Sequence, residues 1–263
     1  MREVLAHVQF RGSIRERSVE PYVRLLKALR SKRRVKGVLF DISSGGGGDI
    51  ASTDLYLAVK RLDQVKPVFA SINSIAASGG YMAALGARRV YAYPDSEVGS
   101  IGVIFPHLAI RQLLDRLGIQ VELLHQGRHK DAYQGLRPLS DEERTKLMAV
   151  AEDSYHSFVE MVARERRRSY EEILPLATGE FWSGRKALEL GLVDALADRE
   201  GVLEALALET GVASQRTVRV APPRPFLDRL VSGGASSLLG GLRGELTDLL
   251  EDALLEGQFG GRR

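Results

Sequence analysis

The first half of the chain alternates short apolar runs with helical patterns, and this alternation restricts the folds it can adopt. The runs at 35–42 and 67–72 are short and mostly apolar, as in parallel strands that are buried on both faces. Apolar residues at helical spacing precede and follow the first run, at 19–29 and 50–62. Strands that alternate with helices predict a right-handed βαβ arrangement, so we expect an α/β fold with a mostly parallel sheet.

The second half has a helical character that begins at Ser140. Ser140 and Glu143 form the pattern of a capping box, and the helix that they open is expected to reach about Arg167. The composition changes after residue 220, where prolines, glycines and serines precede an apolar helical stripe at 245–255 with acidic residues opposite. We therefore expect a single domain over 1–220, followed over 221–263 by a linker and an amphipathic helix.

The composition excludes several classes of function. With 37 basic against 34 acidic residues, the formal charge of +3 is too balanced for a nucleic-acid partner. The chain has no cysteine, which excludes disulfides, thiolate metal sites and a cysteine nucleophile. We expect no metal and no cofactor. We also see no signal peptide and no apolar run long enough to span a membrane, so we expect a cytoplasmic or membrane-peripheral protein.

A serine at a strand-to-helix turn is the first candidate for chemistry. Ser78 follows the apolar run at 67–72 and precedes a segment of small residues with helical character. Alanines and glycines around it allow a peptide backbone to approach closely, and a helix start supplies unbonded amides. The same features describe a tightly packed structural turn, so Ser78 alone does not identify a nucleophile.

Two further loops are expected beside Ser78, because all three would follow strands of a parallel sheet. The glycine row at 45–48 lacks the lysine and serine or threonine of a phosphate-binding loop, but its amides suit a developing oxyanion. The loop at 127–131, after an expected strand at 121–126, carries His129 and Lys130. Either a histidine or a lysine of lowered pKa could activate a serine, although a solvated loop lysine is the simpler interpretation of Lys130.

Five motifs in order resemble the signal peptide peptidase A family of Ser-Lys serine peptidases. This family is related in fold to the Clp protease proteolytic subunit and to crotonases. The resemblance covers about 35–198. Its motifs are Ile42-Ser43-Ser44-Gly45-Gly46-Gly47, Ala76-Ala77-Ser78-Gly79-Gly80-Tyr81, Gly99-Ser100-Ile101-Gly102-Val103, Gly127-Arg128-His129-Lys130-Asp131, and Trp182-Ser183-Gly184 through Gly191-Leu192-Val193-Asp194.

The resemblance implies a role for each site residue and a layered fold of ββα units. Ser78 would be the nucleophile, Lys130 the general base, and Ser100 a hydroxyl that positions the lysine. The amides of Gly46 or Gly47, assisted by Gly79, would form the oxyanion hole. Gly45 stands where the family has proline, which leaves the loop freer and the choice between the two amides open.

The resulting hypothesis is a serine endopeptidase that hydrolyses signal-peptide remnants or unfolded polypeptide through an acyl-enzyme. The resemblance also implies a homo-oligomeric ring, with peripheral membrane association as a further possibility. Two alternatives use the same fold. One is a crotonase-like acyl-CoA enzyme, against which counts the lack of an acidic residue beside Ser78. The other is a catalytically silent oligomeric scaffold.

Overall fold

The computed structural model describes residues 2–222. The expected linker and amphipathic helix of 221–263 lie almost entirely outside these residues. The part of the chain up to Ala221 forms one compact unit. No helix within 2–222 combines the length and apolar character that crossing a bilayer requires.

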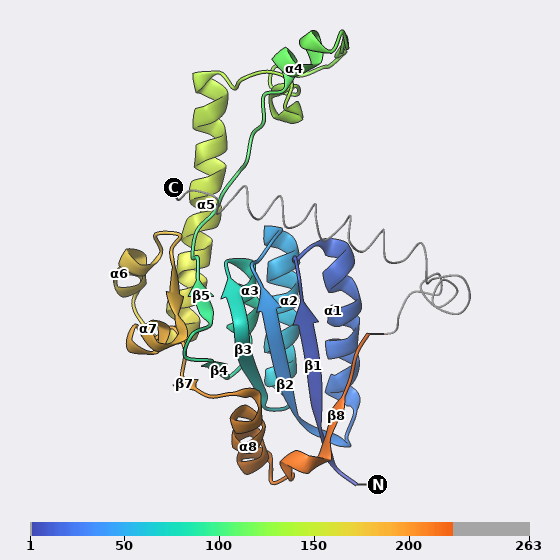
Figure 1. Ribbon diagram of the computed structural model, residues 1–263, viewed down its shortest axis with the longest axis vertical. Coiled ribbons are helices and arrows are strands. Elements are labelled where there is room, and N and C mark those ends of the chain that lie inside the picture. The colour runs from blue at the N-terminus through green and yellow to red at the C-terminus, as the bar shows by residue number, and fades with distance from the viewer. Residues whose placement is uncertain (1, 223–263) are drawn as a thin grey trace, which may run out of the picture. The chain divides into compact units, whose positions relative to one another are not determined.

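The fold is built on one sheet of eight strands with helices on both faces (Figure 1). The strands are β1 (Val4–Arg11), β2 (Val35–Ser44), β3 (Val68–Ala77), β4 (Arg89–Ala92), β5 (Glu97–Gly99), β6 (Phe181–Ser183), β7 (Ala195–Leu196) and β8 (Thr217–Arg219). The helices are α1 (Glu16–Ser31), α2 (Asp49–Asp63), α3 (Gly79–Ala84), α4 (Arg111–Arg116), α5 (Asp141–Arg166), α6 (Tyr170–Ile173), α7 (Gly184–Glu189) and α8 (Arg199–Thr210). Three short 3-10 turns complete the set, η1 (Ala132–Gln134), η2 (Leu174–Leu176) and η3 (Ser214–Arg216).

The sheet is mostly parallel, as the alternation of strands and helices predicts. Its main path runs β6-β5-β3-β2-β1-β8, while β4 pairs with both β3 and β7. Only β5 and β6 pair antiparallel. The α/β class and the mostly parallel sheet are thus confirmed. Because β2 and β3 are neighbours and point the same way, the loops that follow them open at the same edge.

Alternate residues of the central strands enter two different cores. Phe40 on β2 faces the larger core, which α1, α2 and α3 cover. Leu39 faces a smaller core on the other side of the sheet, where Val202 and Leu206 of α8 pack against it. Towards the carboxyl end of the strands this second face becomes polar, beginning with His7 and Asp41.

Helix α5 carries a segment of the chain away from the sheet. As predicted, it begins at the capping box of Ser140 and Glu143, and it spans 26 residues, or about 39 Å. Its buried apolar side chains are confined to the stretch from Phe158 to Ala163. The segment 103–140, hereafter the arm, rises from β5 beside this helix and carries α4 beyond its amino-terminal end, as Figure 1 shows.

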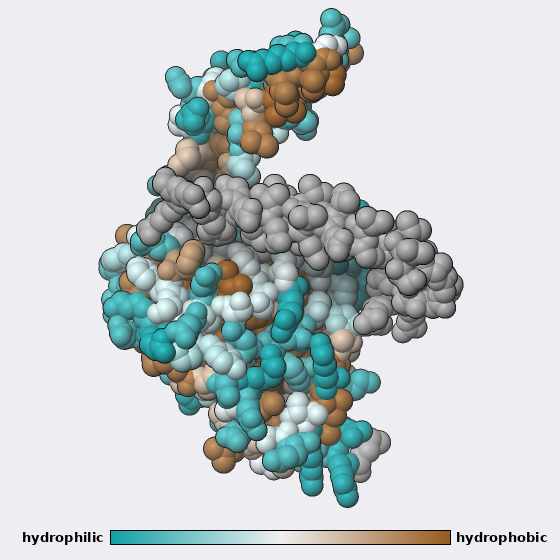
Figure 2. Space-filling model, viewed as in Figure 1, coloured by the Kyte–Doolittle hydropathy of each residue, from teal (hydrophilic) through white to brown (hydrophobic). Residues whose placement is uncertain are grey.

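The arm differs from the sequence-based expectation. Residues 121–126, predicted as a strand, pair with no described strand. Leu123 and Leu124, two of the three apolar residues of this segment, are exposed, Leu124 to 91%. Figure 2 shows the resulting hydrophobic surface on the arm, to which Ile104, Leu108 and Leu117 also contribute. A sheet requires a partner strand, and the described chain places none beside this segment.

Two leucines, each on a helix, test which side chains contribute to the stability of the fold. Leu55 of α2 is fully buried, whereas Leu208 of α8 is 87% exposed. We expect Leu55→Ala to lower the free energy of unfolding by about 2–5 kcal/mol, because it removes packed apolar volume. Leu208→Ala should stay within about 0.5 kcal/mol. Urea denaturation measures both, and equal losses would contradict the assignment of the core.

Candidate active site

Ser78 lies in a strained turn between β3 and α3. Its φ of 50° and ψ of −123° fall where side chains other than glycine are uncommon. The amide of Ser78 donates to the carbonyl of Gly99 at 2.7 Å, which ties the turn to the end of β5. Its hydroxyl does not cap the helix that follows. Strain of this kind is kept where the surrounding structure imposes it, and it often marks a functional residue.

The glycine row after β2 packs directly against this turn. A Cβ atom added to Gly46 would lie 2.9 Å from the Cβ of Ser78 and 2.9 Å from the amide nitrogen of Gly79. Gly46 also has a φ of 102°, so both space and backbone conformation require glycine there. The sequence-based prediction that these two loops meet therefore agrees with the geometry.

Two backbone amides beside Ser78 are left without an acceptor among residues 2–222. The amide of Gly46 is engaged, because it donates to the buried hydroxyl of Ser44 at 3.1 Å. The amides of Gly47 and Gly79 have no such acceptor, and a Cβ on Gly79 would lie 3.5 Å from the nitrogen of Gly47. A pair of close, unbonded amides is the arrangement that stabilises an oxyanion.

Ser100 joins the same region from β5. It follows Gly99, whose carbonyl accepts from the amide of Ser78, and its own amide donates to the carbonyl of Glu180 at 2.6 Å. Ser100 shares with Ser78 a positive φ, here 48°. The structure thus brings together five of the six expected site residues, namely Ser78, Ser100, Gly46, Gly47 and Gly79.

Lys130 is the site residue that the structure does not bring to Ser78 within one chain. It is exposed and belongs to the arm, whose neighbouring residue His129 contacts Glu143 at the start of α5. Glu143 precedes Phe158, the first residue of the buried stretch of α5, by fifteen residues, or about 22 Å of helix. The expectation that the lysine loop follows a strand at the edge of the sheet is wrong.

A buried carboxylate lies beneath the two loops, on the polar face of the sheet. Asp41 of β2 is 1% exposed and accepts hydrogen bonds from His7 at 3.2 Å, Asn73 at 2.7 Å and Arg199 at 2.9 Å. Gln9 of β1 donates to it as well, at 3.1 Å. Burial alone would raise the pKa of Asp41, but the hydrogen bonds and the arginine charge outweigh it and hold the pKa below its usual range. Asp41 therefore connects the two strands, β2 and β3, that carry the glycine row and Ser78.

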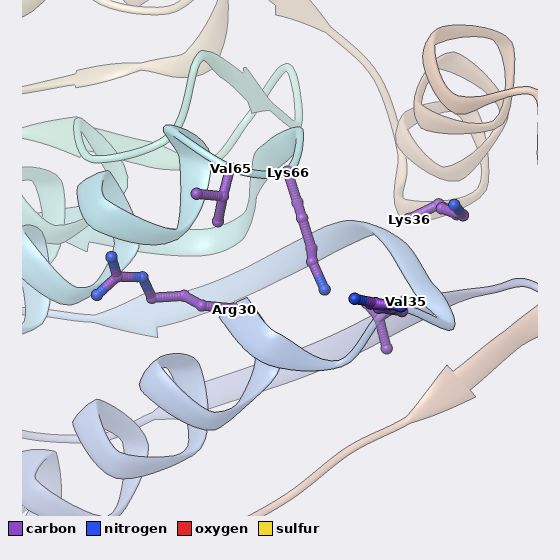
Figure 3. A pocket seen from close by; sticks show the side chains of 6 residues that line it. Arg30, Val35, Lys36, Val65 and Lys66 are labelled. Atoms are coloured by element: carbon purple, nitrogen blue, oxygen red, sulfur yellow. The ribbon is translucent and has the colours of Figure 1, made fainter.

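A basic pocket at the opposite edge of the sheet is structural. It is lined by Arg30, Lys36 and Lys66 among others, near the amino ends of β2 and β3 (Figure 3). The ammonium of Lys66 donates to the carbonyls of Leu29 and Lys32 at the carboxyl end of α1. Cations favour the carboxyl ends of helices, so the local charge is explained without a ligand.

The sequence and the fold are both similar to those of known proteases. The sequence model of Peptidase family S49 matches residues 60–213. A Synechocystis protein provisionally named as a protease, slr0021, is 32% identical over 90% of this chain and 86% of its own. The chloroplastic serine protease SPPA of Arabidopsis thaliana is 29% identical over 87% of this chain and 35% of its own.

Among solved structures, ClpP1 of Listeria monocytogenes superimposes with a TM-score of 0.51 at 16% identity, covering 74% of this chain and 94% of that one. Identity this low establishes similarity of fold alone. The expected resemblance to signal peptide peptidase A and to the Clp protease fold is confirmed by these matches.

The contribution of Asp41 is testable through its pH dependence. A carboxylate whose pKa is lowered on folding stabilises the protein above its unfolded pKa of about 3.9, and this contribution is lost as the pH falls through the folded value. We expect Asp41→Asn to reduce the free energy of unfolding by about 3 kcal/mol at neutral pH. The difference in the free energy of unfolding between Asp41→Asn and the native protein should shrink below about pH 4.

Asp95→Asn is the matched control, because this side chain is 84% exposed in its ion pair with Arg185. It should change stability little at any pH. A loss in Asp41→Asn that is constant from neutral to acid pH would show that charge is not the cause.

Proposed function

The chain belongs to peptidase family S49, and from this membership we propose that it is a serine endopeptidase with Ser78 as nucleophile and Lys130 as general base. The observation that carries the proposal is the position of Ser78 beside the two unbonded amides of Gly47 and Gly79. A hydroxyl at this point can attack a carbonyl carbon while the carbonyl oxygen moves toward the amides. The membership supports a serine protease in general, and the dyad is the specific part of the proposal.

The structure favours Gly47 over Gly46 as the oxyanion donor. The amide of Gly46 already donates to Ser44, whereas the amide of Gly47 has no described acceptor and lies close to Gly79. Gly47 itself admits no side chain, since a Cβ there would lie 2.0 Å from the carbonyl oxygen of Ile14. We propose that Gly47 and Gly79 hold the oxyanion and that Gly46 gives the loop its close approach to Ser78.

The base is supplied in this proposal by the arm of a neighbouring copy. Within one chain the arm holds Lys130 away from Ser78, and its exposed apolar surface requires a partner to bury it. The site side of the molecule also exposes apolar residues, including Ile50 at the start of α2, at 69%. A second copy that covers both surfaces would exclude water from the lysine, and burial favours the neutral amine that can accept a proton. A homo-oligomer is thus part of the catalytic proposal.

The proposed reaction proceeds in two balanced steps. Lys130 takes the proton of the Ser78 hydroxyl as the oxygen attacks the peptide carbonyl, and the protonated lysine then gives that proton to the departing amine. Water next attacks the acyl-enzyme and loses a proton to the same lysine, which returns it to Ser78 as the peptide acid leaves. We propose that Ser100, which follows the residue that binds the Ser78 amide, orients the lysine amine.

Peptides are the proposed substrates. An extended peptide can lie beside the glycine row, where Gly45 and Gly48 leave the backbone open and the alanines before Ser78 present little bulk. This clearance favours small or apolar side chains next to the scissile bond, as signal-peptide remnants and unfolded segments provide. Peripheral association with a membrane would bring the enzyme close to signal-peptide remnants.

Two variants test the dyad and the shared site together. Ser78→Ala and Lys130→Ala should each abolish cleavage of a fluorogenic peptide. When the two inactive variants are mixed and reassembled, about a quarter of the sites should combine an intact serine with an intact lysine and recover activity. Native mass spectrometry verifies that mixed oligomers form. Full activity in Lys130→Ala would overturn the dyad, and mixed oligomers without activity would exclude a base from a neighbour.

A matched pair of glycines tests the glycine row. Gly46 and Gly12 both have positive φ values, 102° and 91°, but only at Gly46 would a Cβ meet other atoms. We expect Gly46→Ala to slow labelling of Ser78 by a fluorophosphonate probe by roughly a hundredfold, because the added Cβ would push Ser78 and the Gly79 amide out of place by about 1 Å. Gly12→Ala carries the backbone strain without the clash and should label normally. Equal labelling rates in the two variants would separate the glycine row from catalysis.

A further inference from the structure

The polar side chains on both sides of Lys130 have partners, whereas the Lys130 side chain has none among residues 2–222. Arg128 pairs with Glu142 at 2.9 Å, and His129 lies 3.4 Å from Glu143. Asp131 pairs with Arg137 at 2.8 Å. Lys130 makes no side-chain hydrogen bond or ion pair with any residue of 2–222, and only its amide is engaged, by the carbonyl of Gly127 at 3.1 Å. The loop is therefore fixed on both sides of a lysine whose amine is left available.

Arg137 holds the loop with every donor of its guanidinium. Two of its nitrogens donate to the Asp131 carboxylate, at 2.8 and 3.1 Å, and two donate to the Glu143 carboxylate, at 2.8 and 2.7 Å. The remaining donor reaches the carbonyl of Pro138 at 3.1 Å. Bidentate pairing of a guanidinium with a carboxylate fixes orientation as well as distance. One arginine thus links the residue after Lys130 to the first turn of α5.

Glu143 connects the Lys130 loop to helix α5, because it accepts from Arg137 and belongs to the first turn of this helix. It is 3% exposed, and its carboxylate accepts from the amide of Ser140 at 2.9 Å, as the capping box in the sequence predicts. Arg137 first, and then the Ser140 amide, hold the pKa of Glu143 well below its usual range, and Arg137 likewise lowers the pKa of Asp131. Both carboxylates are therefore ionised at neutral pH and bind the guanidinium as charged groups.

The rest of the arm has no comparable anchor. Helix α4 has one internal ion pair, between Arg111 and Asp115, and both partners are more than half exposed. Residues 121–126 have no regular structure. Only the lysine loop is joined to α5 by buried charge, although a loop that merely connects two helices would need no such link.

We propose that Arg137 is the positioning residue for the catalytic amine: its double fork to Asp131 and Glu143 fixes the Lys130 loop on α5, so that the arm presents the lysine to a neighbouring Ser78 in one orientation. This inference rests on the proposed Ser-Lys dyad. Arg137 touches neither substrate nor the reacting atoms. Its whole contribution passes through Lys130, which distinguishes it from a residue that only stabilises the arm.

A double-mutant cycle tests this dependence. The measured quantity is the rate at which a fluorophosphonate probe acylates Ser78 in the assembled protein. Arg137→Gln should lower this rate roughly a hundredfold, the expected effect of misplacing a reacting group by about 1 Å. In the Lys130→Ala background the same substitution should change the rate less than twofold, because no lysine remains to be misplaced. In peptide cleavage, Arg137→Gln should lower kcat and leave KM within about twofold.

Controls separate positioning from assembly and from the dyad itself. Arg111→Gln removes another arginine of the arm and should leave the rate of Ser78 acylation unchanged. Asp131→Asn breaks only the contact nearest Lys130, keeps the Arg137 link to α5, and serves if Arg137→Gln fails to assemble by native mass spectrometry. It should lower the rate about tenfold.

Two results would overturn the proposal. One is an unchanged rate in assembled Arg137→Gln or Asp131→Asn. The other is an equal loss in the native and Lys130→Ala backgrounds. A Lys130→Ala variant with full activity would instead refute the dyad.

Discussion

The parallel pairing of β2 with β3 is the constraint on which the site depends. The register that sets Ile42 opposite Ile72 brings the two strand ends to one edge, and Ser44 pairs again with Ala76 beyond a local irregularity. The glycine row and the Ser78 turn then have to share a small space. They do so without side chains, since a single added Cβ on Gly46 would collide with Ser78. Asp41 secures this pairing from the polar face, through His7 on β1 and Asn73 on β3.

Helix α5 holds Lys130, the base in our proposal, away from the sheet edge that carries Ser78. Its carboxyl-terminal part is fixed to the body by apolar packing around Val162 and by the bond from Tyr56 to Glu165 at 2.6 Å. Its amino-terminal part carries the arm with it. Because α5 is one continuous helix of about 39 Å, Lys130 stays away from the Ser78 of its own chain as long as the helix and these attachments are kept. The separation of Ser78 and Lys130 is therefore a property of the fold, and in our proposal it makes activity depend on assembly.

The sequence predicts the sheet edge well and the arm poorly, for a physical reason. Buried parallel strands leave an apolar signal in the sequence, and glycines at positive φ leave another, so the meeting of Gly46 with Ser78 can be inferred from local patterns. A helical stripe indicates that a face is covered but does not indicate by which chain. Met148 continues the apolar stripe of α5 toward its amino terminus and is 62% exposed, whereas Phe158 on the same stripe is buried. The apolar residues at 121–126 mislead in the same way, because an exposed apolar residue looks the same in the sequence as a buried one.

Ser44 orders the glycine row, which has Gly45 where the family resemblance implies a more rigid proline. Gly45 stands where the family has proline, and a Cβ on Gly45 would meet no atom closer than 4.0 Å, so packing does not require glycine there. The greater freedom of this residue in the unfolded chain has to be offset by contacts in the folded one. The buried hydroxyl of Ser44 provides such a contact by accepting from Gly46, and a Cβ on Gly80 would lie 2.3 Å from the carbonyl oxygen of Ser44. The same hydrogen bond engages the amide of Gly46, which is why we propose the amide of Gly47 as the oxyanion donor. Ser44 thus orders the loop through a hydrogen bond, and in our proposal the same bond decides which glycine amide remains available as the oxyanion donor.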